Sequence, residues 1–198
     1  ALILFILSMA SNNAGSNTDK VAEETAARIE KRLAILDSYI AQAQATDKSE
    51  LILPEGLPDD MVVYRYINDS LQSWSNQFPI INDDISSRLV FYRLTNRNHA
   101  LTSPLSEAGE EFTYQNIGAK WYLTKAVTTE DNQKIIAGLE VKNTLIDDAR
   151  KNENGVNPKL RLSRKYSVLP LSNSGGSAVY VNGAPQFKIL YDASQANP

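Results

Sequence analysis

Hydrophobic and polar positions alternate most clearly in residues 111–142, where the pattern predicts β-strands. Three runs rich in β-branched and aromatic residues follow one another there: EFTYQNI (111–117), KWYLTKAVT (120–128) and KIIAGLEV (134–141). Gly118 precedes the second run and the polar turn residues 130–132 precede the third. The second run is partly apolar on both faces, so we expect this strand inside a sheet with a neighbour on either side. The segment therefore predicts a three-stranded antiparallel meander.

Two further hairpins are predicted, one on either side of this meander. The runs MVVYRYI (61–67) and LQSWSN (71–76) flank a polar turn at residues 68–70. Near the end of the chain, Asn182-Gly183 separates AVYV from PQFKILY and is the strongest turn signal of the sequence. Pro185 then stands near the entry of the last strand, where proline is tolerated.

Residues 19–46 carry the clearest helical periodicity. Their apolar side chains repeat at alternating spacings of four and three residues: Ala22, Ala26, Ile29, Leu33, Leu36 and Ile40. This stripe suits a helix that packs on its own domain, and it suits a seam between two chains equally well. In the second case Ile29, Leu33, Leu36 and Ile40 form a dimer and signalling seam. Two prolines and a glycine in residues 53–58 prevent the helix from continuing.

The apolar pattern leaves two stretches open. Residues 86–95 fit a helix capped by Asp83 or Asp84, and they fit a strand equally well by composition. The uninterrupted apolar run at residues 1–9 is too short to span a bilayer by itself, which takes about 20 residues. It suits the end of a membrane helix, the core of a signal peptide, or a buried N-terminal strand. Residues 11–18 are polar, so we expect them to tether that run without packing.

Composition and charge narrow the function classes. The 198 residues suit one domain, or one domain with an appendage, and a helix with several antiparallel strands predicts an α+β fold. A net charge of −3 gives no large basic surface, so we expect no nucleic-acid partner. The chain has no cysteine, which excludes disulfides, thiolate nucleophiles and zinc–thiolate sites.

Candidate chemistry is sparse. His99 is the single histidine and stands in a polar loop without a recognisable acidic or serine partner. The acidic pairs 83–84 and 147–148 lack the alternating ligands of a calcium loop. A short helix, TLIDDARKN (144–152), accounts for the second pair as a solvated face. The basic cluster Arg161, Arg164 and Lys165 suits a solvated strand edge or an anionic ligand. We therefore expect no catalytic residue, no metal and no cofactor, and a chain that is not an enzyme.

Aromatic side chains with polar groups are the best candidates for ligand contact. Such residues line small-molecule pockets, although they also fill the cores of small sheets. The candidates are Tyr64, Trp74, Tyr92, Tyr114 and Tyr122.

Five segments carry a resemblance when they are taken together and in order: NDSLQSWS (68–75), NIGAKWYLTKAV (116–127), IAGLEVKN (136–143), NGVNPKLRLS (154–163) and SGGSAVYVNGAPQFKIL (174–190). They resemble the extracytoplasmic sensor region of Bacteroidetes-type two-component histidine kinases, including hybrid kinases. The resemblance implies a PAS-like or Cache-like sensor domain over residues 60–192, on the periplasmic side of the inner membrane. Residues 1–10 then correspond to the end of a transmembrane helix, and residues 19–50 to a signalling helix.

The function implied by this resemblance is signal sensing. A small-molecule or protein signal would be passed to a cytoplasmic kinase by helix rearrangement, in a membrane-anchored homodimer that pairs through the N-terminal helix. The phospho-accepting histidine and the ATP-binding glycine motifs of the kinase are not matched in this chain, so phosphotransfer would lie elsewhere in the protein. The alternative is an exported soluble or lipid-anchored protein that binds a small molecule.

Overall fold

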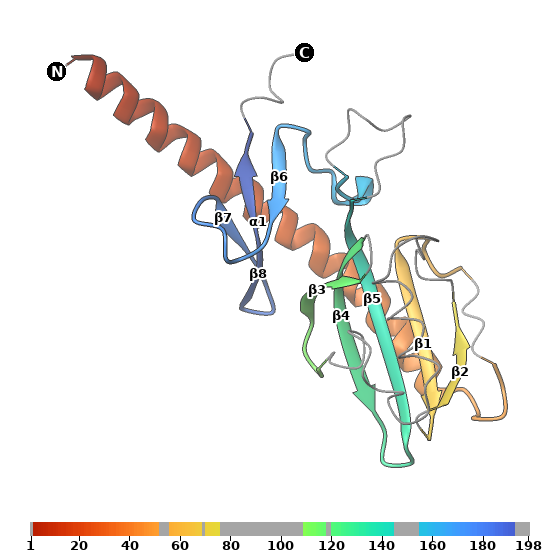
Figure 1. Cartoon of the computed structure of the whole chain (residues 1–198). Coiled ribbons are helices and arrows are strands. Elements are labelled where there is room, and N and C mark those ends of the chain that lie inside the picture. Colours follow the sequence, from red (N-terminus) through yellow and green to blue (C-terminus); the bar gives the residue numbers. More distant parts are fainter. Residues whose placement is uncertain are drawn as a thin grey trace. The chain divides into compact units, whose positions relative to one another are not determined.

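The computed structural model describes residues 2–51, 56–68, 70–75, 109–117, 120–144 and 155–192. These residues form an α+β structure with a long helix, a short 3₁₀ helix and eight strands in two antiparallel sheets (Figure 1). The α+β class that the sequence predicts is confirmed. The chain divides into two compact units, one made of Ala1–Lys31 with Ile146–Pro198 and the other of Arg32–Leu145.

The N-terminal helix α1 (Leu2–Ala45) is longer than the sequence predicts. It ends close to the predicted boundary, but its backbone is also helical through residues 11–18, where a tether is expected. That expectation is wrong because the segment holds no proline, and Gly15 inside a helix costs only about 1 kcal/mol relative to alanine. Among the described residues, no helix has an apolar stretch long enough to cross a membrane.

One stripe of α1 is buried by the chain itself: Thr18, Ala22, Thr25, Ile29, Leu33, Leu36, Ile40 and Ala43. Thr25 takes the place predicted for Ala26 because the helix follows a 3.6-residue period and not a strict heptad. Ile29, Leu33, Leu36 and Ile40 are at most 4% exposed within a single chain. Of the two alternatives for this stripe, the structure therefore has the helix packing on its own chain. These four side chains are covered by the single chain, and a homodimer that pairs through them stays a prediction.

The larger unit holds an antiparallel sheet in the order β2-β1-β5-β4-β3. Its strands are β1 (Met61–Ile67), β2 (Ser70–Trp74), β3 (Thr113–Ile117), β4 (Lys120–Thr128) and β5 (Gln133–Asn143). The first predicted hairpin and the predicted meander are confirmed, and β4 lies between β3 and β5 as its two partly apolar faces indicate. The hairpin joins the meander because β1 pairs with β5 along its whole length.

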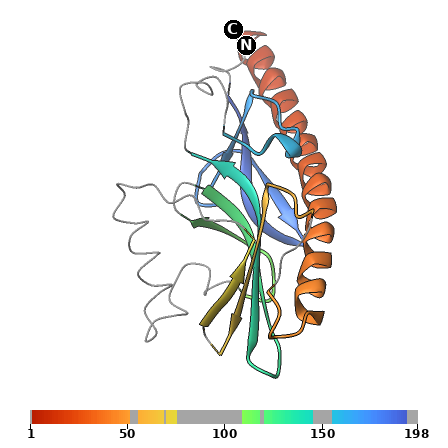
Figure 2. The same cartoon turned by 90° about the vertical axis from the view of Figure 1, so that its right-hand side faces the viewer.

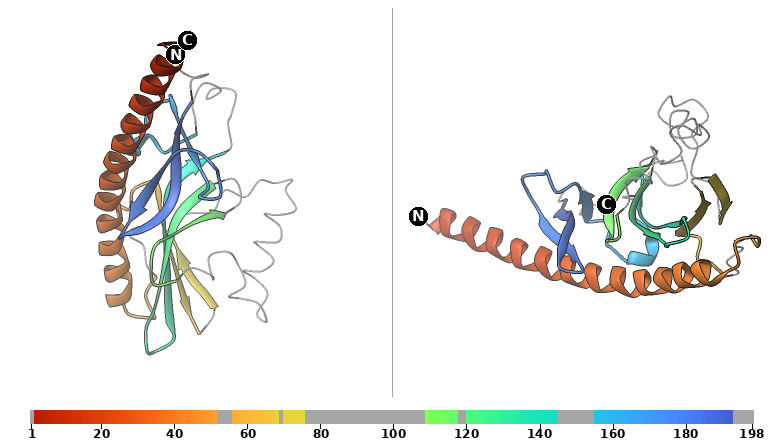
Figure 3. Two further views of the ribbon diagram at one scale, coloured as in Figure 1. Left: turned by 90° about the vertical axis from the view of Figure 1, so that its left-hand side faces the viewer. Right: turned by 90° about the horizontal axis from the view of Figure 1, so that it is seen from below.

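The C-terminal half of α1 lies along one face of this sheet, as Figures 2 and 3 show. Two ion pairs hold it there. Arg32 Nη2 lies 2.5 Å from Asp60 Oδ1, just before β1, and Lys125 Nζ on β4 lies 2.9 Å from Asp37 Oδ1. The Lys125 ammonium also lies 5.1 Å from the centre of the Phe112 ring, which is a cation–π contact.

The smaller unit holds an antiparallel sheet in the order β6-β8-β7. Its elements are the 3₁₀ helix η4 (Pro158–Leu160) and the strands β6 (Tyr166–Leu169), β7 (Ser177–Val181) and β8 (Ala184–Tyr191). The predicted Asn182-Gly183 hairpin is confirmed. The φ angles of these residues are 50° and 79°, and a type I′ turn requires both to be positive. The N-terminal part of α1 is bonded to this unit, for example from Arg28 Nη1 to the Leu160 carbonyl at 3.3 Å.

The core of this smaller sheet is apolar and includes Val168, Val179, Val181, Phe187 and Ile189. The basic cluster Arg161, Arg164 and Lys165 is exposed and comes before β6, so it does not lie on a strand. The alternatives for residues 86–95, the predicted helix 144–152, Tyr92 and His99 fall outside the described residues, apart from residue 144.

Candidate functional site

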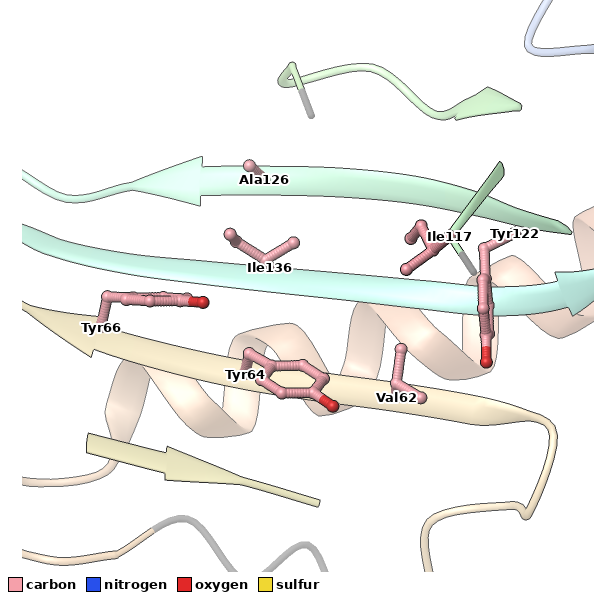
Figure 4. Packing of buried hydrophobic residues seen from close by; sticks show 7 residues of the cluster. All are labelled: Val62, Tyr64, Tyr66, Ile117, Tyr122, Ala126 and Ile136. Atoms are coloured by element: carbon pink, nitrogen blue, oxygen red, sulfur yellow. The ribbon is translucent and has the colours of Figure 1, made fainter. Parts of the chain in front are cut away.

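Three tyrosines gather on the face of the five-stranded sheet that points away from α1. Tyr64 and Tyr66 on β1 and Tyr122 on β4 are at most 3% exposed. They form one buried cluster together with Val62, Ile117, Ala126 and Ile136 (Figure 4). Successive side chains of a strand point to opposite faces, so even-numbered residues of β1 and β4 share this surface. We call this cluster the tyrosine face.

The hydroxyl of Tyr66 is the most unusual polar atom of the tyrosine face. Tyr66 is 1% exposed, and its Oη has no hydrogen-bond partner among the described residues. Burial raises the pKa of Tyr66 to about 12 because a charged phenolate would lose its hydration. A buried hydroxyl without a partner costs about 1–3 kcal/mol, so this atom is a ready donor or acceptor for a ligand.

The tyrosine face ends in an ion pair. Lys120 Nζ lies 2.5 Å from Glu140 Oε2, and Glu140 stands opposite Tyr122 in the β4–β5 ladder. Burial and, to a smaller extent, the charge of Glu140 raise the pKa of the Tyr122 phenol. The phenol therefore stays neutral, and the face offers apolar surface and phenolic hydroxyls beside one charged pair.

Gly138 on β5 is what lets the tyrosine face pack so closely. A Cβ atom at this position would lie 3.1 Å from Val62 Cγ2 and 3.4 Å from Tyr122 Cδ1. The missing side chain thus allows β1 and β4 to bring their side chains together over β5.

Arg65 occupies the opposite face of β1, between Tyr64 and Tyr66, and is 0% exposed. Its guanidinium makes a hydrogen bond with each of its five N–H donors. The acceptors are Gln72 Oε1 (2.7 Å) and the carbonyl oxygens of Ala43 (3.4 Å), Thr46 (3.2 Å), Asp47 (2.7 Å) and Glu50 (3.0 Å). These carbonyls belong to the last turn of α1 and to the loop after it, so Arg65 fastens β1 to the end of the helix.

Gln72 completes this arrangement from β2. The β1–β2 register shifts between Arg65 and Tyr66, since Arg65 pairs with Ser73 and Tyr66 with Leu71. Gln72 is the extra residue of this bulge, and bulges turn a side chain in a new direction. Its Nε2 donates to the Lys48 carbonyl at 2.5 Å and to the Glu50 carbonyl at 3.2 Å. We call Arg65 and Gln72 the helix clamp.

The structure brings together some of the residues predicted for ligand contact and separates others. Tyr64 and Tyr122 meet on the tyrosine face, and Trp74 stands opposite Tyr64 on β2 and is 49% exposed. Tyr114 stands opposite Leu123 in the β3–β4 ladder, so it lies on the other face. There its ring stacks on Trp121 with 4.9 Å between ring centres. Tyr92 is outside the described residues.

Comparison of the chain with protein-family models, with curated proteins and with solved structures finds no match. A functional proposal therefore rests on the strand order, the tyrosine face and the helix clamp.

Three residues of the site are not among the sequence candidates for ligand contact: Tyr66, Arg65 and Gln72. The signal for Arg65 is its position inside the apolar run MVVYRYI, because a cation there must either reach solvent or be fully bonded. Tyr66 follows Tyr64 at the two-residue spacing of one strand face. Gln72 has no comparable signal, because its role depends on a β-bulge and the run LQSWSN contains no residue pattern that predicts one.

The chemistry available at this site is that of binding. Within the described residues there is no group of three or more metal-ligating side chains. The tyrosine face supplies phenols held neutral by burial and aliphatic surface, and neither is a nucleophile or a general base near pH 7.

Proposed function

We propose that this chain is the extracytoplasmic sensing domain of a membrane-bound two-component histidine kinase. The observation that carries the proposal is the strand order β2-β1-β5-β4-β3, antiparallel throughout, with a helix from the N-terminal side on one face. We take this order to be that of the PAS-like sensor sheet which the segment resemblance implies. A likeness of fold alone favours a sensing function and does not identify a ligand. The segment resemblance between residues 68 and 190 supports the same function.

The tyrosine face is the surface that we propose reads the signal. It combines apolar packing with one hydroxyl whose hydrogen bond is unmade among the described residues. A small molecule that places a polar atom at Tyr66 Oη gains that bond, and because Tyr66 is 1% exposed, its entry requires the packing over this face to change. Binding can shift a receptor between two states only by the difference of its affinity for them.

The test uses the complete gene product in membrane vesicles with labelled ATP. A sensor kinase takes up a phosphoryl group that is labile in acid and stable in base, as phosphohistidine is. The complete gene should also encode a second apolar segment of about 20 residues after Pro198. A product that takes up no label and lacks that segment overturns the proposal, and the exported binding protein then takes its place.

A site variant links the phosphorylation to the tyrosine face. Gly138→Ala adds one methyl group to that face, whereas Gly175→Ala in the smaller unit adds a methyl at an ordinary 3.6 Å contact with Leu190 Cδ1. The first variant should change the level of phosphorylation in the vesicles, and the second should leave it unchanged. Equal phosphorylation in both variants would exclude the tyrosine face as the sensing surface.

A further inference from the structure

Strand β1 carries two kinds of side chain on its two faces. Tyr64 and Tyr66 lie on the tyrosine face, and Arg65 between them lies on the face of α1. The three residues are consecutive and at most 3% exposed, so none can move independently of the others in a close-packed interior. A displacement of β1 at the tyrosine face is therefore also a displacement of the Arg65 guanidinium.

The groups that Arg65 holds are the ones a helix cannot satisfy by itself. The last four carbonyls of an α-helix have no partner within the helix, and the helix dipole places partial negative charge there. Arg65 bonds one carbonyl of the last turn and three carbonyls beyond it. The order of residues 43–50 therefore depends in part on the position of Arg65 on β1, together with the bonds from Gln72 on β2.

The β1–β2 bulge lies next to Arg65, where a shift of β1 can change the position of the guanidinium. The β1–β2 ladder is irregular between Arg65 and Tyr66, next to the tyrosine whose hydroxyl is unpartnered among the described residues. A ladder with an extra residue has lost regular pairing at that step and bends there more easily than elsewhere. Gln72, the extra residue, bonds both Arg65 and the loop after α1.

We infer that the helix clamp couples the tyrosine face to the C-terminal end of α1. A change of packing at the tyrosine face changes the position of β1, and Arg65 and Gln72 pass this change to residues 43–50. Both are positioning residues and neither contacts the signal. The inference rests on the proposed function, because it takes the tyrosine face to be the surface that reads the signal.

The experiment replaces the unknown ligand by a methyl group placed inside the 198-residue chain. Gly138→Ala adds its methyl on the tyrosine face, 3.1 Å from Val62 Cγ2, so this buried side chain of β1 must give by a few tenths of an ångström. Amide hydrogen exchange is then measured at Thr46 and Glu50. Their N–H groups donate to Gln42 O at 3.1 Å and to Asp47 O at 3.0 Å. The same measurement is made in Gln72→Ala, in the double variant, and in the control Gly175→Ala.

The expected result is local and non-additive. Exchange at Thr46 and Glu50 should accelerate at least about fivefold in Gly138→Ala, while the amides of β7 and β8 and the control variant keep their wild-type rates. Exchange at these two amides should already be fast in Gln72→Ala, and adding Gly138→Ala should change it no further. A residue that only stabilises the fold would give additive effects.

Three results would overturn the coupling. Unchanged exchange at Thr46 and Glu50 in Gly138→Ala shows that the face and the helix end are independent. Equal acceleration throughout β4 and β5 shows general loosening of the sheet. Full acceleration in the Gln72→Ala background shows a route that bypasses the clamp. If Gly138→Ala does not fold, Ile136→Val removes one methyl from the same face and is judged by the same criteria.

The outcome is independent of the kinase assay, because it needs only this chain. If the gene product is a kinase and the exchange rates do not change, the proposed function stands and the coupling is refuted. If the exchange rates change but the gene product is not a kinase, the coupling stands and the proposed function is refuted.

Discussion

A buried arginine whose acceptors are backbone carbonyls and one amide places strict demands on geometry. The guanidinium of Arg65 has five donors in a fixed plane, and all five are used. Lysine carries the same charge but has three donors around a single point. The residue is therefore specified by its shape as well as by its charge.

Replacement of Arg65 by lysine should lower the free energy of unfolding by about 2–4 kcal/mol, because lysine cannot make all five hydrogen bonds and leaves a buried charge incompletely bonded. Urea denaturation of the purified chain measures this loss. Arg164→Lys makes the same change at an exposed position and should stay within about 0.5 kcal/mol of wild type. Equal stability of the two variants would show that Arg65 is not held as the distances indicate.

Tyr66 makes stability fall in alkaline solution. Its pKa is raised from 10.0 to about 12 in the folded chain because the side chain is buried. As the pH rises from about 10 to about 12, the unfolded chain loses this proton first and unfolding becomes easier. The wild type should therefore lose about 1.4 kcal/mol per pH unit relative to Tyr66→Phe in that window.

Denaturation of the two proteins in parallel measures this difference. The other buried tyrosines are present in both, so their contributions cancel. Between pH 7 and pH 9 the difference in stability should be constant, because neither state has yet lost the proton of Tyr66. A constant difference up to pH 12 would contradict the burial of this phenol.

At the scale of elements, two glycines of the smaller unit allow the effect of backbone strain to be distinguished from the effect of steric crowding. Gly176 and Gly183 have φ angles of +88° and +79°, which disfavour any residue with a Cβ atom. At Gly183 nothing lies within 4 Å of an added Cβ, whereas at Gly176 the added atom would lie 2.6 Å from the Ile189 carbonyl oxygen. The two positions share the strain and differ in the space around them.

Gly183→Ala should lower the free energy of unfolding by about 1–2 kcal/mol, because alanine must adopt a left-handed conformation there. Gly176→Ala should cost at least about 1 kcal/mol more, because β8 must also move away from the added methyl. Thermal denaturation of the two variants gives the order. A reversed order would mean that the loop before β7 rearranges freely.

Local signals explain which elements the sequence could predict. Asn182-Gly183 and the alternating runs of β1, β4 and β5 carry their own turn chemistry and periodicity, and these elements are where they are expected. The extension of α1 through residues 11–18 depends on the absence of a stop signal, which is harder to interpret than a cap. The pairing of β1 with β5 and the bulge at Gln72 are contacts between distant segments, so no local pattern specifies them.

At the scale of the whole molecule, the stripe of α1 shows why a heptad does not imply a partner chain. The same spacing of apolar residues serves a helix on a sheet and a helix in a coiled coil. Here the sheet of the larger unit and the clamp residues take up the C-terminal half of the helix. The candidate site was predicted only in part, because residue type alone does not say which face of a sheet a side chain occupies. Tyr64 and Tyr122 were predicted from their residue type and share one face, whereas the register of the β3–β4 ladder places Tyr114 on the other face.

Leu36→Ala and Ile35→Ala distinguish packing within the chain from pairing between chains. Leu36 is 0% exposed and its truncation should cost about 2–5 kcal/mol, whereas Ile35 is 42% exposed and its truncation should cost less than about 0.5 kcal/mol. The thermal midpoint of wild type and of Leu36→Ala should not depend on protein concentration. A midpoint that rises with concentration and loses that dependence in Leu36→Ala would place the stripe between two chains.

The helix clamp also has a consequence for the medium in which the protein works. Lys125 and Asp37 attract each other as partly exposed charges, and dissolved electrolyte weakens that attraction. Arg65 is instead 0% exposed and holds carbonyl dipoles, so its contacts hold no pair of opposite charges that salt could screen. The helix is thus attached in two ways, and added salt should weaken the Lys125–Asp37 contact while the Arg65 contacts and the buried stripe of α1 keep their strength.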